Sequence, residues 1–171
     1  MKFLRLIPIL FIVFGFFPSK NLVFANTEDP SSYKVLSNKK KFSIANVEYY
    51  IEKGDKFIES GDFDKAKASY LDARELATNL GSYYLDLTNV FKRVDARIPN
   101  ETRKKGKASL EILAKSNERL ISLYIKNDQP EVAVPLLIEN LRILTPNSPE
   151  GKEAYKTLIQ LGFVETEYKG G

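Results

Sequence analysis

The chain has 171 residues, of which 43% are hydrophobic and 28% are charged, and its formal net charge is +4. These values are typical of a globular domain and exclude a collagen-like, mucin-like or wholly disordered chain. The sequence has no histidine and no cysteine, which excludes disulfide bonds, Ser-His-Asp or Cys-His catalysis and an ordinary zinc site.

Residues 1–25 have the layout of a secretory signal peptide. A short basic start with Lys2 and Arg5 precedes an almost wholly apolar run at residues 6–17, and residues 23–25 (VFA) suit cleavage after Ala25. The apolar run is shorter than the ~20 residues that a membrane span needs. We therefore expect an exported protein, and the alternative is a membrane anchor formed by an uncleaved leader.

The charge of the chain is largely a property of this leader. Without its three basic residues, the 26 basic and 22 acidic residues of the chain become 23 and 22. A nucleic-acid-binding protein needs a concentrated basic face, so we expect no nucleic acid partner. The basic run at residues 103–107 is interpreted as an exposed polar face of a helix.

The rest of the chain divides into three parts. Residues 26–43 are polar and rich in Ser, Asn and Lys, which is typical of a linker. Residues 44–164 carry apolar residues at helical spacing and form the predicted domain. Residues 165–171 (ETEYKGG) are predicted to be a frayed tail.

The first half of the domain predicts three helices. The first spans residues 44–60 and contains Gly54, whose cost of about 1 kcal/mol is explained if a neighbouring helix passes close to it. Gly61 ends this helix and Asp62 caps the second, at residues 63–79. Gly81 and Ser82 are expected to end the second helix and start a third at residues 83–94.

The second half predicts a loop and three further segments. Residues 97–100 are expected to form the loop, because proline disfavours helix in the residue before it. Residues 101–127 then form one long helix, or two joined by a kink near residues 116–117. A helix at 131–144 follows, and a last helix begins at Ser148-Pro149-Glu150 and stops at Gly162.

Residues 47–78 resemble one tetratricopeptide (TPR) repeat, which is a pair of antiparallel helices. The residues that carry the resemblance are small or aromatic: Tyr50, Gly54, Phe57, Gly61, Phe63, Ala66, Tyr70 and Ala73. Tyr50 and Phe57 recur 34 residues later, as Tyr84 and Phe91. The resemblance implies an all-α, right-handed stack of about six antiparallel helices, with one degenerate middle repeat that contains a long helix.

The resemblance is to small exported TPR proteins of bacteria, cyanobacteria included, and it implies a periplasmic or thylakoid-lumen location. In this family the first helix of each pair lines a concave groove that binds a protein or peptide. Carried over by position, the lining residues here are Glu48, Ile51, Asp55, Ile58, Glu59, Leu85, Asn89, Lys92, Arg93, Lys115, Arg119 and Ser122. Ile51, Asp55 and Asp86 replace the groups that some TPR domains use to clamp a C-terminal carboxylate, so no such clamp is expected.

The function that we expect is binding: a TPR-type adaptor, scaffold or assembly factor outside the cytoplasm. We expect no catalytic residue, cofactor or metal ion, and membrane contact only if the leader is uncleaved. One alternative is a carboxylate-based enzyme or an accessory domain of envelope processing, for which Asp55 and Glu59 lie four residues apart, although ordinary surface acids explain them better. The other alternative is a structural protein that self-associates through exposed tyrosines.

Overall fold

The computed structural model of the chain describes residues 42–169. The predicted signal peptide, all but the last two residues of the predicted linker and the last two residues of the tail lie outside the described residues. Over residues 42–169 the fold is all-α, as predicted, with five helices and no strand. In chain order the helices are α2 (Ile44–Glu59), α3 (Phe63–Phe91), α4 (Arg97–Lys126), α5 (Pro130–Leu144) and α6 (Pro149–Gln160).

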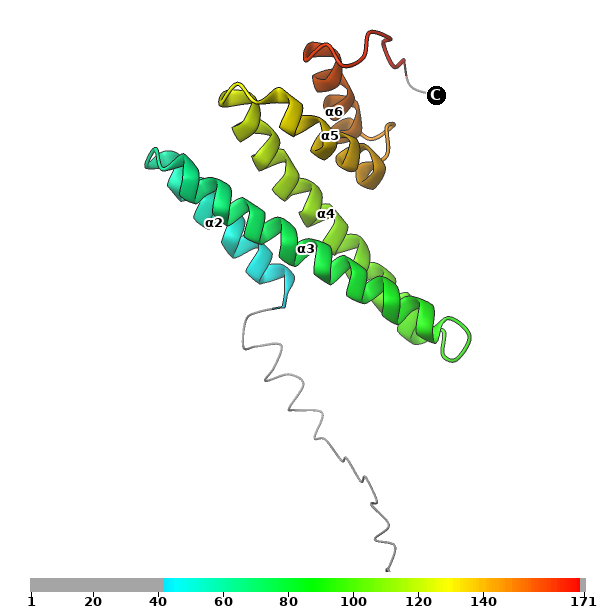
Figure 1. Cartoon of the computed structure of the whole chain (residues 1–171). Coiled ribbons are helices and arrows are strands. Elements are labelled where there is room, and N and C mark those ends of the chain that lie inside the picture. The colour runs from blue at the N-terminus through cyan, green and yellow to red at the C-terminus, as the bar shows by residue number, and fades with distance from the viewer. Residues whose placement is uncertain (1–41, 170–171) are drawn as a thin grey trace, which may run out of the picture.

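The two longest helices, α3 and α4, form an antiparallel pair at the centre of the domain, and the other helices pack around it (Figure 1). The α2 helix packs along the N-terminal part of α3 and also contacts α4. The α5 helix packs on α4, and α6 packs on α5. Beyond these helices the C-terminal end of α3 and the N-terminal end of α4 project as a two-helix hairpin (Figure 1).

The predicted helix boundaries around residues 60–63 are confirmed. The α2 helix starts after Ser43, whose Oγ accepts a hydrogen bond from the Asn46 N–H at 3.3 Å. Gly61 follows the helix with a φ of +77°, a conformation that glycine adopts without steric cost. Asp62 then caps α3 by accepting from the Lys65 N–H at 3.2 Å.

Gly54 on α2 lies directly against the Tyr70 ring of α3. A Cβ atom added there would lie 2.3 Å from Cε1 of the Tyr70 ring. Ala66 and Ala73, on either side of Tyr70 along α3, are fully buried. The expectation that a neighbouring helix explains this glycine is therefore confirmed, and the neighbour is α3.

The predicted break at Gly81 and Ser82 is wrong, because α3 continues without interruption to Phe91. Gly81 is not among the residues with positive φ, so it remains helical here. The buried stripe also continues across it, since Leu80 and Tyr84 both pack in the same hydrophobic cluster. The second and third predicted helices are one helix, and the described residues form five helices where about six were expected.

The predicted loop at residues 97–100 is also wrong, because α4 begins at Arg97. Pro99 is the third residue of α4, where a missing N–H is harmless since the first-turn donors have no partner within the helix. The Asp95 Oδ1 accepts from the Arg97 N–H at 2.9 Å and helps to start the helix. The long helix, predicted as one or two, is a single helix that ends at Lys126.

Two clusters of buried side chains form the core. The α5–α6 core joins α3, α4, α5 and α6; its residues are Ala66, Tyr70, Leu120, Ile121, Tyr124, Ala133, Leu137, Ala154 and Leu158. The α2 core joins α2, α3 and α4; its residues are Val47, Ile51, Ala73, Ala77, Leu80, Ile112 and Leu113. Neither list includes a residue of the segment 81–111, which we call the hairpin end, and only the partly buried Tyr84 of this segment packs against a core.

The two C-terminal helices agree with the prediction. The Ser148 Oγ caps α6 by accepting from the Gly151 N–H at 2.9 Å, and Gly162 follows this helix with a φ of +76°. The described part of the tail, predicted to be frayed, is not helical, but it contacts α6. The Tyr155 hydroxyl donates to the Thr166 carbonyl at 2.8 Å, and the Tyr155 ring packs edge-on against Tyr168.

Candidate functional site

A groove runs between α3 and α4 along the hairpin end, and we call it the α3–α4 groove. Its volume is about 470 Å³. Both long helices contribute its walls, and α5 contributes one residue at one end. The lining residues are Thr78, Gly81, Ser82, Tyr84, Leu85 and Thr88 from α3, Thr102, Arg103, Gly106, Lys107, Leu110 and Leu113 from α4, and Glu139 from α5.

Small residues lie on both walls of this groove. Gly81 and Ser82 on α3, and Gly106 on α4, leave the space between the helices unfilled. A Cβ atom at Gly106 would lie 3.4 Å from the Tyr84 Cβ, and one at Gly81 would lie 3.6 Å from Cδ2 of Leu110. The two helices therefore approach closely while the groove above them stays open.

Two threonines link the helices in the groove. The Oγ1 atoms of Thr88 and Thr102 are 2.6 Å apart and share a hydrogen bond. The Thr88 Oγ1 also lies 2.7 Å from the Tyr84 carbonyl, and the Thr102 Oγ1 lies 2.9 Å from the Ile98 carbonyl. Because both hydroxyls have partners within the protein, this part of the groove requires no polar group from a ligand.

The walls of the groove expose large apolar side chains. Leu85 on α3 is 60% exposed and Leu110 on α4 is 43% exposed. Single exposed leucines are common at protein surfaces, but two that line the same hollow form a continuous apolar surface. This surface is the strongest indication of a binding site in the described residues.

The α4 wall is also basic. Arg103 and Lys107 are four residues apart, so they lie one helical turn from each other on the same face. Their contacts with neighbours are long: Arg103 Nη1 lies 3.5 Å from Asn100 Oδ1, and Lys107 Nζ lies 3.6 Å from Glu111 Oε1. Both cations are exposed and able to contact a bound partner.

The acidic lining residue, Glu139, already has two partners. Its Oε2 accepts from Arg74 Nη2 on α3 and from Asn117 Nδ2 on α4, each at 2.8 Å. Asn117 also bonds Asn140 Oδ1 at 3.0 Å, and the Asn140 amide donates to the Ala114 carbonyl at 3.1 Å. This network joins α3, α4 and α5 and leaves the positive charge of the α4 wall dominant in the groove.

Comparisons with known proteins give no assignment. The chain matches no family model, no curated protein and no solved structure. Among residues 42–169, none of the helices has both the length and the apolar character of a membrane span. The same residues bring together no three acidic side chains in a way that suits a metal ion. The site must therefore be judged by its own geometry.

The predicted lining residues do not form one surface. Leu85 alone among the twelve lines the α3–α4 groove. Ile51, predicted to line the groove, is 2% exposed and lies in the α2 core. Ile58 packs against the α5–α6 core, whereas Glu48, Glu59 and Asn89 are exposed on their helices.

The remaining predicted residues lie in other parts of the molecule. Lys92 and Arg93 follow the end of α3 in the turn of the hairpin. Lys115 and Arg119 line a hollow between α4 and the turn that joins α5 to α6, and Ser122 lines one between α4 and α6. The TPR pattern assigns residues 83–94 to the first helix of a repeat, but residues 83–91 are the last part of α3 and residues 92–94 belong to the turn after it, so the transferred positions scatter.

Asp55 joins three helices instead of lining a groove. Its Oδ1 accepts from the Tyr70 hydroxyl at 2.7 Å and from Arg119 Nε at 2.9 Å. Burial raises the pKa of Asp55, but the hydrogen bonds from Arg119 and Tyr70 outweigh this effect and hold the pKa below its ordinary value. Burial and the Asp55 carboxylate raise the pKa of Tyr70. Asp55 is thus an ionised structural contact.

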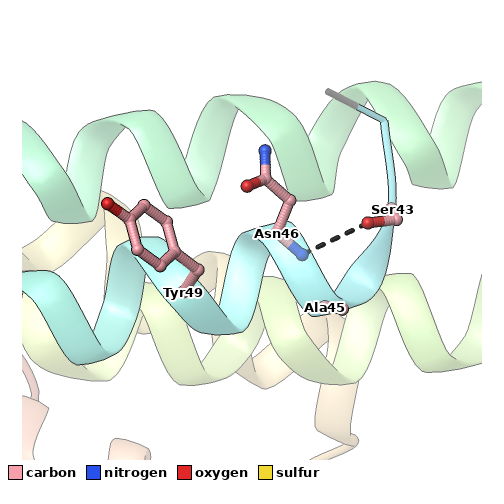
Figure 2. Close-up of a pocket in the computed structure, with 4 residues that line it drawn as sticks. All are labelled: Ser43, Ala45, Asn46 and Tyr49. Atoms are coloured by element: carbon pink, nitrogen blue, oxygen red, sulfur yellow. Dashed lines mark hydrogen bonds between the residues drawn. The ribbon is translucent and has the colours of Figure 1, made fainter. Parts of the chain in front are cut away.

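Another hollow lies at the start of α2 and is lined by Ser43, Ala45, Asn46 and Tyr49. Figure 2 shows these four residues on the first turns of one helix, with the Ser43 hydroxyl already bonded to the Asn46 N–H. No charged side chain is among these four residues. The α3–α4 groove, in which both Leu85 and Leu110 are exposed, remains the candidate site.

The sequence interpretation missed the α4 wall of the groove. Gly106, Leu110 and the basic run at residues 103–107 are visible in the sequence, and the run was expected to be a solvated face. A usable indication was the spacing of Gly81 with Leu85 on one helix and of Gly106 with Leu110 on the next. Each pair is four residues apart, so the small and the large residue share one face.

Proposed function

We propose that this chain is a non-enzymatic protein-binding module, an adaptor or assembly factor outside the cytoplasm, and that it holds a segment of its partner in the α3–α4 groove. The observation that carries the proposal is the exposure of Leu85 and Leu110 in one hollow. Covering the exposed parts of both leucines would contribute about 1–3 kcal/mol to binding. Export is part of the proposal and rests on the layout of residues 1–25.

We also propose that the fold is a TPR-like stack in which the second helix of one repeat and the first helix of the next are joined into the continuous helix α3. In support, α2 and the first half of α3 pack through Gly54 and Tyr70, where the repeat pattern has its small and aromatic residues. The α2 helix also contacts α4, so it packs against a helix beyond its own pair, as in a stack of helix pairs. The continuous α3 is the departure from the pattern, and it produces the hairpin end that carries the groove.

Site-specific crosslinking tests the binding role. A photoreactive amino acid is placed at Leu85 in the native host, and at the exposed Lys152 on α6 as the control. We expect a discrete crosslinked product from position 85 that is absent from position 152. Identical products from both positions, or none from position 85, would contradict the groove assignment.

A double variant tests the leucines directly. We expect Leu85→Gln with Leu110→Gln to reduce recovery of the crosslinked or co-purified partner at least tenfold, because both apolar contacts are lost. The thermal midpoint should change little, since both side chains are already largely exposed in the free protein. Recovery of the same partner at the same level would show that the groove is not the binding surface.

A self-associating structural role is the second candidate. The exposure of Tyr49 and Tyr83 favours it, because tyrosine is enriched in protein interfaces. Tyr83 already packs edge-on against Phe42 and Tyr84, which occupies part of its ring. Sedimentation velocity over a hundredfold range of concentration decides the matter, and a monomer throughout would exclude this role.

A further inference from the structure

We infer that the partner segment in the α3–α4 groove is an amphipathic helix of another protein, about three turns long, with acidic side chains along the edge that faces α4. The inference rests on the proposed function and specifies the chemistry of the segment that is bound.

The backbone of the groove favours a helical ligand. Both walls are interior parts of α-helices, in which N–H and C=O groups bond one another along the helix. Such walls offer no free strand edge to an extended peptide, whose own backbone groups would lose water without gaining partners. A helix satisfies its backbone internally and can enter an apolar groove without that cost.

The walls set the length of the ligand. The lining residues run from Thr78 to Thr88 on α3 and from Thr102 to Leu113 on α4. At 1.5 Å per residue these stretches are about 15–17 Å long, which matches about three turns of a helix. Glu139 of α5 bounds the groove at the end that carries Thr78 and Leu113, so the bound helix would extend the layer that α5 begins.

The residues within the groove set the face that the ligand must present. Leu85, Leu110, Tyr84 and Leu113 supply apolar contacts, and the threonine pair is already satisfied. A ligand side chain with an unpaired polar group would lose its hydration there without compensation. The buried face of the ligand is therefore apolar.

The basic side chains of the α4 wall determine which charges the ligand carries along the edge that faces them. Arg103 and Lys107 form the charged part of the α4 wall, and the lining residues Thr78 and Ser82 of the α3 wall are neutral. Over residues 81–111 the chain has seven basic and four acidic residues. Asp95 and Glu101 pair with Arg97 and Lys105, and Glu111 lies 3.6 Å from Lys107, but the segment remains net positive. Acidic residues three or four apart on one edge of the ligand would face both cations.

Two other occupants fit these observations less well. A lipid surface is flat and would not reach the interior of a hollow between two helices. A second copy of this chain in a two-fold arrangement would bring the same basic hairpin ends together, and their like charges would oppose association. Vesicle binding and sedimentation velocity would detect these two occupants.

Three synthetic peptides of about 14 residues test the inference with the purified chain. They share one apolar face of leucine and alanine and differ only at two positions, four residues apart on one edge, which are Glu, Gln or Lys. Fluorescence anisotropy should give an affinity for the Glu peptide about fivefold above that for the Gln peptide and more than tenfold above that for the Lys peptide. These differences should shrink as salt is raised.

Charge-reversal variants locate the effect. Arg103→Glu with Lys107→Glu should reverse the order, so that the Lys peptide binds best. The matched control is Lys152→Glu with Lys156→Glu, an exposed pair four residues apart on α6, which makes the same change in net charge. The control should leave the order unchanged. Reversal by the control as well would show a general effect of net charge and overturn the inference.

The remaining outcomes separate this inference from the proposed function. Equal affinities for the three peptides, all weakened by Leu85→Gln with Leu110→Gln, would overturn the acidic edge and leave the groove as a binding site. Absence of binding by every peptide, with a crosslinked partner at position 85, would also overturn the inference alone. Absence of both would overturn the inference and the proposed function together.

Two assays report the other occupants. Binding to phosphatidylglycerol vesicles that needs Arg103 and Lys107, without binding of any peptide, would assign the groove to a membrane surface. A dimer in sedimentation velocity that Leu85→Gln with Leu110→Gln dissociates would assign it to a second copy. Either result would overturn the acidic helix as the occupant.

Discussion

The carboxylate of Asp55 connects the first three described helices at one point. It accepts from Tyr70 on α3 and, through both oxygens, from Arg119 on α4 at 2.9 and 3.3 Å. The side chains of Asp55 and Arg119 remain about 40% exposed. Solvent therefore screens the ion pair, and the interaction is worth less than a buried pair of the same geometry.

The lowered pKa of Asp55 predicts a dependence of stability on pH. Because ionised Asp55 is favoured in the folded state, its contribution is present above the unfolded pKa of about 4 and is lost as pH falls through the folded pKa. Asp55→Asn should cost about 1 kcal/mol at pH 7 and less at pH 3. Urea denaturation at pH 7 and at pH 3 measures the loss in free energy of unfolding, and Glu59→Gln, at an exposed position, is the control. An equal loss at both values would contradict the pKa argument.

Gly54 is a residue whose replacement by alanine should be harmful despite the better helix propensity of alanine. The new Cβ would overlap the Tyr70 ring, which is buried and held by its hydroxyl bond to Asp55. The higher helix propensity of alanine would stabilise the folded state by about 1 kcal/mol, but overpacking against the ring would destabilise it by about 1–3 kcal/mol or more. We expect Gly54→Ala to lower the urea midpoint, and a raised midpoint would show that the ring moves freely.

At the scale of elements, Gly81 is a second helical glycine, and we expect its replacement by alanine to have the opposite effect on stability to Gly54→Ala. It lies within α3 with helical φ, and a Cβ there would make an ordinary contact of 3.6 Å with Leu110. Gly81→Ala should therefore raise the free energy of unfolding by about 1 kcal/mol. Urea denaturation compares it directly with Gly54→Ala. If α3 were broken at Gly81 by a left-handed glycine, the alanine variant would instead be less stable.

Sequence patterns correctly predicted the helix ends that depend on side chains close to them in the sequence. The Gly61–Asp62 junction and the start of α6 at Ser148 depend on side chains within three residues, so they are visible in the sequence. Gly81 and Pro99 were misleading because both residues also occur inside helices, and packing between α3 and α4 decides which state forms. The repeat of Tyr50 at Tyr84 is real, but it does not require a helix break.

The candidate site was predicted only in part for a similar reason. Leu85 was identified because it occupies a position that the TPR pattern assigns to a groove. Leu110, Arg103 and Lys107 follow from the pairing of α3 with α4, and this pairing depends on the continuity of α3. Asn140 on α5 bonds Asn117, which lies 23 residues earlier on α4, a pairing that no local rule predicts.

At the scale of the molecule, the polar network of Arg74, Asn117, Glu139 and Asn140 joins α3, α4 and α5 beside the two cores. Asn117 is fully buried and bonds the other three residues. We expect Asn117→Ala to cost about 1–3 kcal/mol, because its partners lose bonds in a site with little water.

Urea denaturation followed by circular dichroism measures the effect of Asn117→Ala. The control is Asn89→Ala, an exposed asparagine on α3, which should change stability by less than about 0.5 kcal/mol. Because Asn117 bonds to α3 and α5 from its position on α4, the variant should also broaden the transition. A transition as steep as that of the parent, with no loss of stability, would show that the network is dispensable.

Apart from Tyr84, no residue of the hairpin end packs against either core, and this has an evolutionary consequence. Side chains at positions such as 82, 85, 103, 107 and 110 can be exchanged without disturbing the residues that fold the domain. A lineage that carries this architecture can therefore acquire a new ligand through a few surface substitutions. Related chains should then diverge fastest on that face of the hairpin, while the alanines and rings near Tyr70 stay the same.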